Sequence, residues 1–167
     1  MPNDVFRAID AVLVLGVDDT SSPEGAAADE LVSQYDLSNA VGRLHEVTIA
    51  VGTDLRPFYE IGRRYPTHLR PGIVRVSGSA RRAHVNGALL RLLLGGGAVS
   101  PPSEANFVQP SFNIVATLRD PARPDGQTRV IVFGAKFDSW VYTIPISEDF
   151  VMERVSFQAL RVSFEES

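Results

Sequence analysis

The sequence predicts a mainly β fold, a sandwich or barrel flanked by one or two short helices, in a single domain covering residues 1–167. Apolar and polar residues alternate in several separate segments, and this period of two is typical of half-buried strands. Helical periodicity is confined to two short segments, and turns rich in Gly, Pro and Asp separate the strands.

The N-terminal part is expected to contain a strand, an acidic loop and a short helix. Residues 11–17 form an apolar run that predicts the strand, and the acidic residues Asp18 and Asp19 open the loop. A helix is expected over residues 25–34, because Ser22 and the proline that follows it are typical of a helix start. Residues 18–42 are therefore interpreted as one acidic loop-and-helix insertion.

Two alternating segments in the middle of the chain predict a hairpin. Residues 44–51 and 73–82 are its strands, and residues 56–72 are expected to form a long loop between them. One face of this hairpin carries small apolar groups and the other carries small polar groups. Such a strand pair suits the wall of a channel better than the centre of a core.

The remaining elements follow from the same reasoning. Asn86 precedes an apolar stretch and three glycines, which predicts a capped short helix with a glycine stop. Residues 111–118 and 128–144 predict two strands joined by a hairpin connection at 120–127. The last segment changes its apolar face near Ala159, which predicts a bulge or bend there.

The net charge of −4 conceals an uneven distribution. Seven arginines and no acid lie between Ile61 and Ser103, so the rest of the chain holds 9 of the 16 basic residues against all 20 acids. A basic and an acidic surface on one molecule would suit a nucleic-acid site, or a head-to-tail contact between identical copies.

The usual signatures of catalysis are missing from the sequence. With no cysteine there is no disulfide, thiolate nucleophile or cysteine metal site. His45, His68 and His84 lack the spacing of metal ligands, and no Gly-x-Ser-x-Gly elbow or phosphate-binding Gly-rich loop occurs. We expect no enzyme, cofactor or metal. The apolar runs are shorter than the roughly 20 residues of a membrane helix, and the N-terminus does not resemble a signal peptide, so no membrane association is expected.

Two segments carry a resemblance to phage tail tube proteins. The first is VTIAVGTDLRPFYEIGRRYPTHLRPGIVRVSGSARRAHVNGALLRLLLG, with its aromatic-Glu-aliphatic-Gly-Arg stretch, its Val-Ser-Gly-Ser strand and its Asn-started helix. The second, FDSWVYTIPISEDFVMERVSFQALRVSFEE, resembles the closing hairpin of that family. Together they cover about half the chain, and the motif is a pattern of residue types rather than a catalytic signature.

The resemblance implies a non-enzymatic structural protein of a virion tail. Subunits of this family form six-membered rings that stack head to tail, and their hairpins join in one β-barrel around a channel for DNA. The loop between the two lumen strands then reaches the next ring, which assigns it Tyr59, Glu60, Arg63, Arg64, Tyr65, His68 and Arg70. The candidates for the lumen-facing side are Thr48, Ala50, Arg75, Ser77, Ser79 and Arg81.

The same resemblance implies the partners and the location. A tape-measure protein would occupy the lumen, a sheath would surround the tube if the tail is contractile, and DNA would pass without sequence-specific binding. The protein would be found in the virion tail, and in the host cytoplasm during assembly. Tube lumens are typically acidic, so Arg75 and Arg81 are expected to pair with acids such as Glu46 and Asp54 on the adjoining strand.

Three alternatives remain open at this stage. A tail terminator, completion or baseplate tube-like protein would share the fold and form a single ring. A monomeric β-barrel could carry a small ligand, which would need an apolar interior. An arginine-dependent nucleic-acid binder would show steeply salt-dependent binding.

Overall fold

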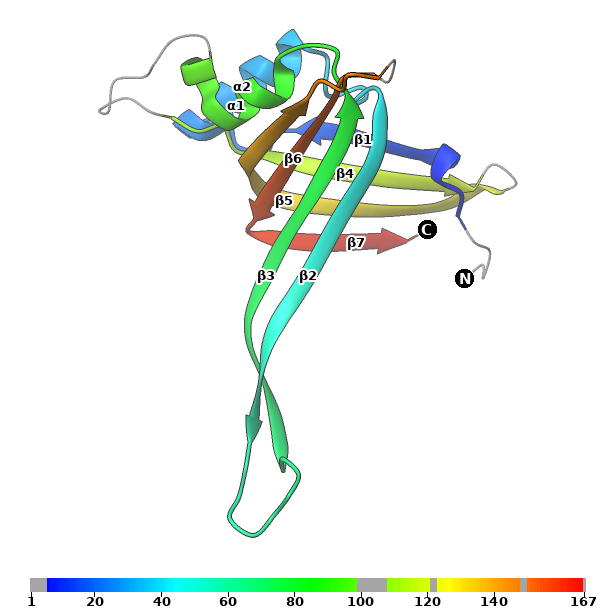
Figure 1. The fold of residues 1–167 in the computed structure, drawn as a ribbon. Coiled ribbons are helices and arrows are strands. Elements are labelled where there is room, and N and C mark those ends of the chain that lie inside the picture. Colours follow the sequence, from blue (N-terminus) through cyan, green and yellow to red (C-terminus); the bar gives the residue numbers. More distant parts are fainter. Residues whose placement is uncertain (1–5, 99–107, 121–122, 148–149, 167) are drawn as a thin grey trace.

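The protein is mainly β, as predicted. The computed structural model describes residues 6–98, 108–120, 123–147 and 150–166 (Figure 1). The strands are β1 Ala11–Gly16, β2 Leu44–Phe58, β3 His68–Ala83, β4 Phe112–Asp120, β5 Arg123–Thr143, β6 Met152–Ala159 and β7 Arg161–Glu166. The helices are α1 Pro23–Gln34 and α2 Ala88–Leu94, with 3-10 turns at Ala8–Asp10 and Gly95–Ala98.

The strands form one curled antiparallel sheet in which β5 belongs to two halves. The first half has the order β1-β4-β5-β7, and the second has the order β2-β3-β6-β5. Residues 128–133 of β5 pair with β7, whereas residues 136–143 pair with β6. One long strand runs through both halves, so the sheet curls (Figure 1), and buried residues from both halves belong to one hydrophobic core.

A bend at Gly134 and Leu160 allows β5 to change partners. Gly134 has φ +63°, a conformation that favours glycine, and a Cβ there would lie 2.6 Å from Leu160 Cδ1. Leu160 separates β6 from β7, and its backbone N–H donates to Phe133 O at 3.0 Å. The bend predicted near Ala159 is confirmed, since the apolar face switches where β6 ends.

Both predicted helices are present and cover the core. Ser22 Oγ accepts the N–H of Gly25 at 3.1 Å, so α1 begins at Pro23 rather than at the predicted Gly25. The N-cap of α2 is Gly87 rather than the predicted Asn86, although Asn86 Oδ1 accepts the N–H of Ala88 at 3.1 Å. The buried side chains that these helices contribute are Ala28, Leu31, Val32, Ala88, Leu89 and Leu92.

The predicted loop at residues 56–72 is wrong in its bounds. β2 continues to Phe58 and β3 begins at His68, so only residues 59–67 connect them. Pairing continues from Leu55↔Pro71 to Phe58↔His68 after a register shift. Pro57 and Pro71 both fit this part of the hairpin, because it is an exposed pair of strands in which each proline can lie at the edge of its strand.

Candidate functional site

The six residues predicted to face a lumen lie on one exposed face of the half-sheet β2-β3-β6-β5. Thr48 pairs with Ser79 and Ala50 with Ser77, and residues paired across two strands share a face. Arg75 and Arg81 alternate with these serines on β3 and join the same face. The opposite face of β3 is the core side, where Val76 is buried.

The structure adds polar residues from β6 and β5 to this face, which we call the polar face. Ser156 pairs with Ser79, and Gln158 pairs with Ser77 on one side and with Lys136 on the other. Sequence reasoning did not assign these residues to a site. Their alternation with buried Val155 and Phe157 was visible in the sequence, but their position beside β3 depends on long-range pairing.

A hydrogen-bond network holds the polar groups of this face in place. Ser156 Oγ donates to Asp138 Oδ1, and Gln158 Nε2 donates to Asp138 Oδ2 at 3.1 Å. Arg154 donates to Ser79 Oγ at 3.4 Å. The hydrogen bond from Ser156, assisted by that from Gln158, lowers the pKa of Asp138 below its ordinary value of 3.8. The carboxylate is therefore fixed in its charged form at neutral pH.

Removing the Ser156 hydroxyl is expected to raise the pKa of Asp138 toward 3.8, because the main hydrogen bond to the charged form is lost. A pKa that is lowered on folding contributes stability that is complete above the unfolded value and is lost as the pH falls through the folded value. An NMR titration of the Asp138 carboxyl in Ser156→Ala measures the shift. Ser79→Ala is the matched control, and an unchanged pKa in Ser156→Ala would contradict the assignment.

Of the two arginines that were expected to pair with acids on β2, Arg75 does so, and in the described part of the chain Arg81 does not. Arg75 forms an ion pair with Asp54 at 3.1 Å, across the register shift in the hairpin. Arg81 lies opposite Glu46 in the register, but within the described residues it forms no ion pair. The expected pairing is therefore confirmed for Arg75 with Asp54.

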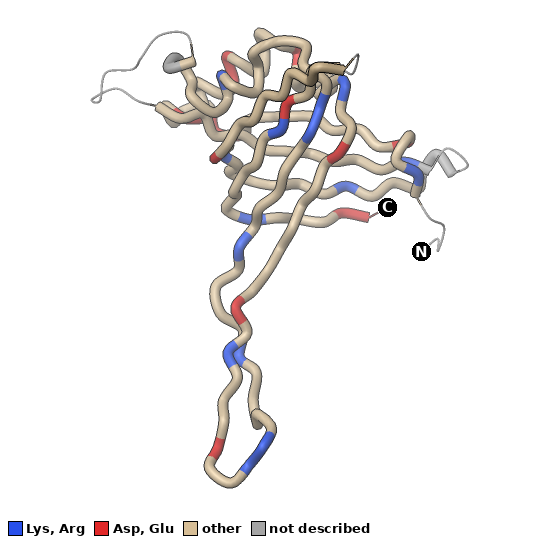
Figure 2. Tube along the Cα trace, in the orientation of Figure 1, with Lys and Arg blue, Asp and Glu red and all other residues tan. Residues whose placement is uncertain are grey.

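Beyond the body of the molecule, β2 and β3 continue as a projecting arm, which we define as residues 55–71 (Figures 1 and 2). Its turn contains an ion pair between Glu60 and Arg63 at 3.7 Å, and Gly62 adopts φ +87°. The seven residues predicted for the inter-ring loop all lie on the arm and are exposed. Tyr59, Glu60, Arg63, Arg64 and Tyr65 belong to the turn, whereas His68 and Arg70 belong to β3.

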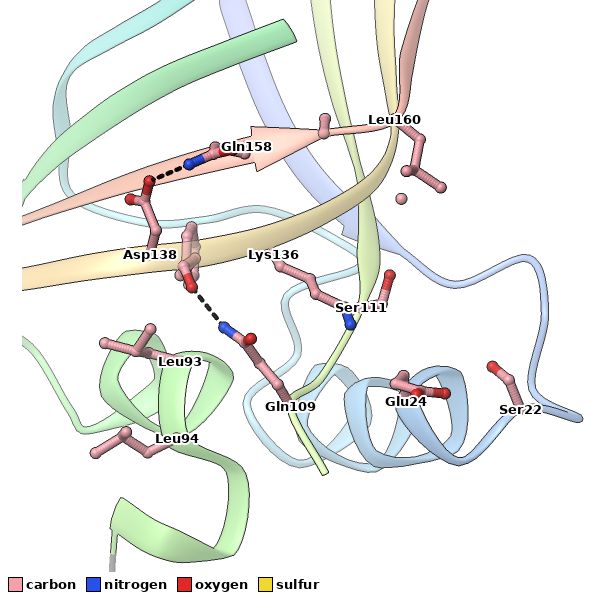
Figure 3. Close-up of a pocket in the computed structure, with 13 residues that line it drawn as sticks. Ser22, Glu24, Leu93, Leu94, Gln109, Ser111, Lys136, Asp138, Gln158 and Leu160 are labelled. Atoms are coloured by element: carbon pink, nitrogen blue, oxygen red, sulfur yellow. Dashed lines mark hydrogen bonds between the residues drawn. The ribbon is translucent and has the colours of Figure 1, made fainter. Parts of the chain in front are cut away.

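The half-sheet that carries the polar face has two open edges. β2 pairs only with β3, so its second edge has no strand partner in the described part of the chain. Residues 136–143 of β5 pair with β6 on one side, while β4 reaches only to Ala135 on the other. Gln109 Nε2 donates to Phe137 O at 2.5 Å beside this second edge (Figure 3). Unpaired strand edges of this length invite pairing with another chain.

A hollow of about 770 Å³ opens between the helices and the bend of β5 (Figure 3). Leu93 and Leu94 of α2 border it on one side, and Leu160 borders it on another, whereas Glu24 and Asp138 add acidic groups. This hollow lies on the flank of the molecule rather than inside the sheet, whose interior is filled by side chains such as Phe112 and Phe157. Among the described residues, the space enclosed by the sheet is therefore a packed hydrophobic core.

Among the described residues, no group of three or more His, Asp or Glu side chains is arranged to hold a metal ion. Within the same ranges, none of the helices is long and apolar enough to cross a membrane.

The fold is similar to that of several solved structures. A chain of the PVC sheath-tube complex of an extracellular contractile injection system, in its extended state, has a TM-score of 0.64 at 12% identity, with 99% of this chain and 94% of that chain covered. The PVC sheath/tube terminator gives 0.64 at 14% identity, covering 98% of each chain. The SPP1 tail tube gives 0.58 at 13% identity, covering 98% of this chain and 80% of that chain.

No protein-family model and no curated protein matches the sequence. Identities of 12–14% establish a shared architecture and nothing finer. The resemblance noted in the sequence is thereby confirmed at the level of structure: the chain has the fold found in tail tube and tube-terminator assemblies.

Proposed function

We propose that this chain is a structural, non-enzymatic subunit of the tail or injection tube of a phage-like particle. The observation that carries the proposal is the incompleteness of the single molecule. One four-stranded half-sheet has two open edges in the described part of the chain, and its strands β2 and β3 extend into an arm that projects away from the body of the molecule (Figure 1). Assembly of identical copies would complete both features.

Ring closure would occur between unlike edges. The free edge of β2 in one copy would pair with residues 136–143 of β5 in the next, which is a heterologous contact that closes when the rotation allows it. Val47 and Val51 support this arrangement, since they lie on the core side of β2 and remain exposed in the single chain. A neighbouring copy would cover them, and the polar face would line the channel.

Stacking of rings would use the arm. The arm exposes large apolar side chains, including Leu55, Phe58, Tyr59, Ile61 and Tyr65. Exposed apolar groups that lie together in this way are typical of a surface that contacts another molecule. Contact of the arm with a copy in the adjacent ring would bury them. The seven residues assigned to the inter-ring loop are proposed to make this contact, and Thr48, Ala50, Arg75, Ser77, Ser79 and Arg81 to face the channel.

The finer features of the proposal come from the resemblance. They are six-membered rings, a tape-measure protein in the lumen, a sheath around a contractile tail, and passage of DNA without sequence-specific contacts. The location would be the virion tail, with assembly in the host cytoplasm. A tube terminator that forms a single ring is the second candidate, because the terminator structure matches this chain as well as the sheath-tube complex does.

Electron microscopy of the purified protein at high concentration tests the proposal and separates these candidates. Stacked tubes are the result expected of a tube subunit, whereas single rings that never stack would favour the terminator. If only compact monomers formed under every condition tried, the proposal would fail. Steeply salt-dependent DNA binding by such a monomer would then favour the nucleic-acid binder.

Shortening the arm is expected to abolish tubes and leave rings. Replacing residues 55–71 by a two-residue Asn-Gly turn would join the paired parts of β2 and β3 directly and leave the body of the fold unchanged. Circular dichroism and thermal unfolding would confirm that the shortened chain folds. Tubes as long as those of the wild type, formed by the shortened chain, would show that stacking does not depend on the arm.

A further inference from the structure

Two arginines of the arm lie directly opposite each other. The register of the hairpin pairs Arg56 of β2 with Arg70 of β3, and both side chains are exposed. Like charges at directly opposed positions destabilise a strand pair. Within the described residues neither arginine forms an ion pair, whereas Arg63 in the turn has Glu60. The pair is thus an uncompensated positive charge on a segment that projects into solvent.

The register also divides the arm into two faces of different chemistry. One face carries Arg56 and Phe58 beside Arg70 and His68, and the rings of Phe58 and His68 lie 6.3 Å apart. We call these four residues the arginine face. The other face carries residues 55, 57, 69 and 71, which are leucines and prolines. Any partner of the arginine face must therefore bring negative charge, while the second face can be covered by apolar groups.

The chain itself carries a complementary surface at its other end. Residues 18–36 contain six acids and no basic residue. Within this segment Asp29 and Glu30 of α1 are exposed, and no described residue forms an ion pair with either. Asp19 and Asp36, by contrast, are engaged by Ser21 and Asn39. Figure 1 places α1 at the end of the molecule remote from the turn of the arm, so the two charged surfaces cannot meet within one chain.

We propose that the arginine face binds the carboxylates of Asp29 and Glu30 on α1 of a second copy. A guanidinium can donate two parallel hydrogen bonds to a carboxylate, and the two adjacent arginines would each donate to one of the two acids. The contact would relieve the repulsion between Arg56 and Arg70 and fix which end of one copy meets which end of the next. This inference rests on the proposed function, because it names the partner of the arm within the assembly.

A charge swap tests the contact. Reversing the arm in Arg56→Glu/Arg70→Glu, or the helix in Asp29→Arg/Glu30→Arg, is expected to raise the protein concentration needed for tube formation at least tenfold. The variant with all four substitutions restores opposite charges across the contact and is expected to form tubes near the wild-type concentration. Arg7→Glu/Arg119→Glu changes the net charge as much as the arm reversal does, but on the body, and serves as the control.

Several outcomes would overturn the inference. It fails if both double variants assemble as the wild type does, or if the fourfold variant assembles no better than they do. It fails in favour of a nucleic-acid partner if the arm reversal abolishes a gel shift of double-stranded DNA that the helix reversal leaves intact. A wild-type chain that forms no assembly at all would instead refute the proposed function, and this contact would fall with it.

Discussion

Glu153→Ala is expected to destabilise the protein by about 3–5 kcal/mol, because it leaves a buried arginine without its counter-charge. Arg82 and Glu153 are both almost fully buried, and Arg82 Nε donates to Glu153 Oε1 at 2.6 Å. Trp140 Nε1 donates to the other carboxylate oxygen at 3.0 Å. His84 Nδ1 lies 3.3 Å from that same oxygen but lacks hydrogen-bond geometry toward it.

This cluster fixes the relative position of four elements. Arg82 is the second-last residue of β3, Glu153 is the second residue of β6, and Trp140 lies on β5. Arg82 also donates to Asn86 Oδ1 at 3.2 Å, just before α2. Urea unfolding of Glu153→Ala beside the double variant Arg82→Met/Glu153→Leu measures the effect. The double variant should recover most of the loss, since it removes both charges and keeps the volume filled. A loss below about 1 kcal/mol in Glu153→Ala would show that the buried pair is not needed.

Gly78→Val is expected to cost about 3 kcal/mol or more, because the half-sheet has no space for a side chain at this position. A Cβ on Gly78 would lie 2.1 Å from the backbone oxygen of Thr48 and 2.4 Å from Cζ of Phe157. Phe157 is directly opposite Gly78 in the register and is only 2% exposed, so its ring cannot move into solvent without opening the core.

The neighbouring residue Ser77 provides the matched control. Ser77→Val changes an exposed residue of the same strand on the polar face and should alter the free energy of unfolding by about 0.5 kcal/mol or less. Combining Gly78→Val with Phe157→Leu should recover part of the loss, since a smaller side chain makes room for the valine. Equal stability of the Gly78 and Ser77 variants would contradict the close packing of β3 against β6.

The elements that the sequence predicted are those with strong local patterns. Patterns within a few residues predicted the helices that follow Ser22 and Asn86. They also predicted the strands β2 and β3, by alternation, and the change of apolar face near Ala159. The bounds of the arm were not predicted, because Pro57 and Pro71 are typical of loops unless the strand is known to be exposed. The double role of β5 was equally hidden, since it depends on which distant strands pair with each half.

The candidate site divides in the same way. Alternation placed Ser77 and Ser79 on one face of their strand, and the resemblance added Thr48 to that face; the register pairs Thr48 with Ser79. The contribution of Asp138 and Ser156 depends on pairing between strands far apart in the sequence, which no local pattern contains. The open edges of β2 and β5 could not be predicted either, because a strand is recognised as an edge only when the order of all strands in the sheet is known.

Cross-linking between the two open edges tests the central claim, that identical copies join β2 to β5. The chain has no cysteine, so Thr48→Cys/Val141→Cys introduces a unique pair of thiols, both exposed on the polar face. Three strand spacings separate them within one chain, roughly 15 Å, so a shorter thiol cross-linker should join only neighbouring copies. The proposal predicts a ladder of covalent oligomers that ends at one closed ring, expected at six subunits from the resemblance. A cross-linked sample that remains monomeric, at concentrations where the wild-type protein assembles, would contradict it.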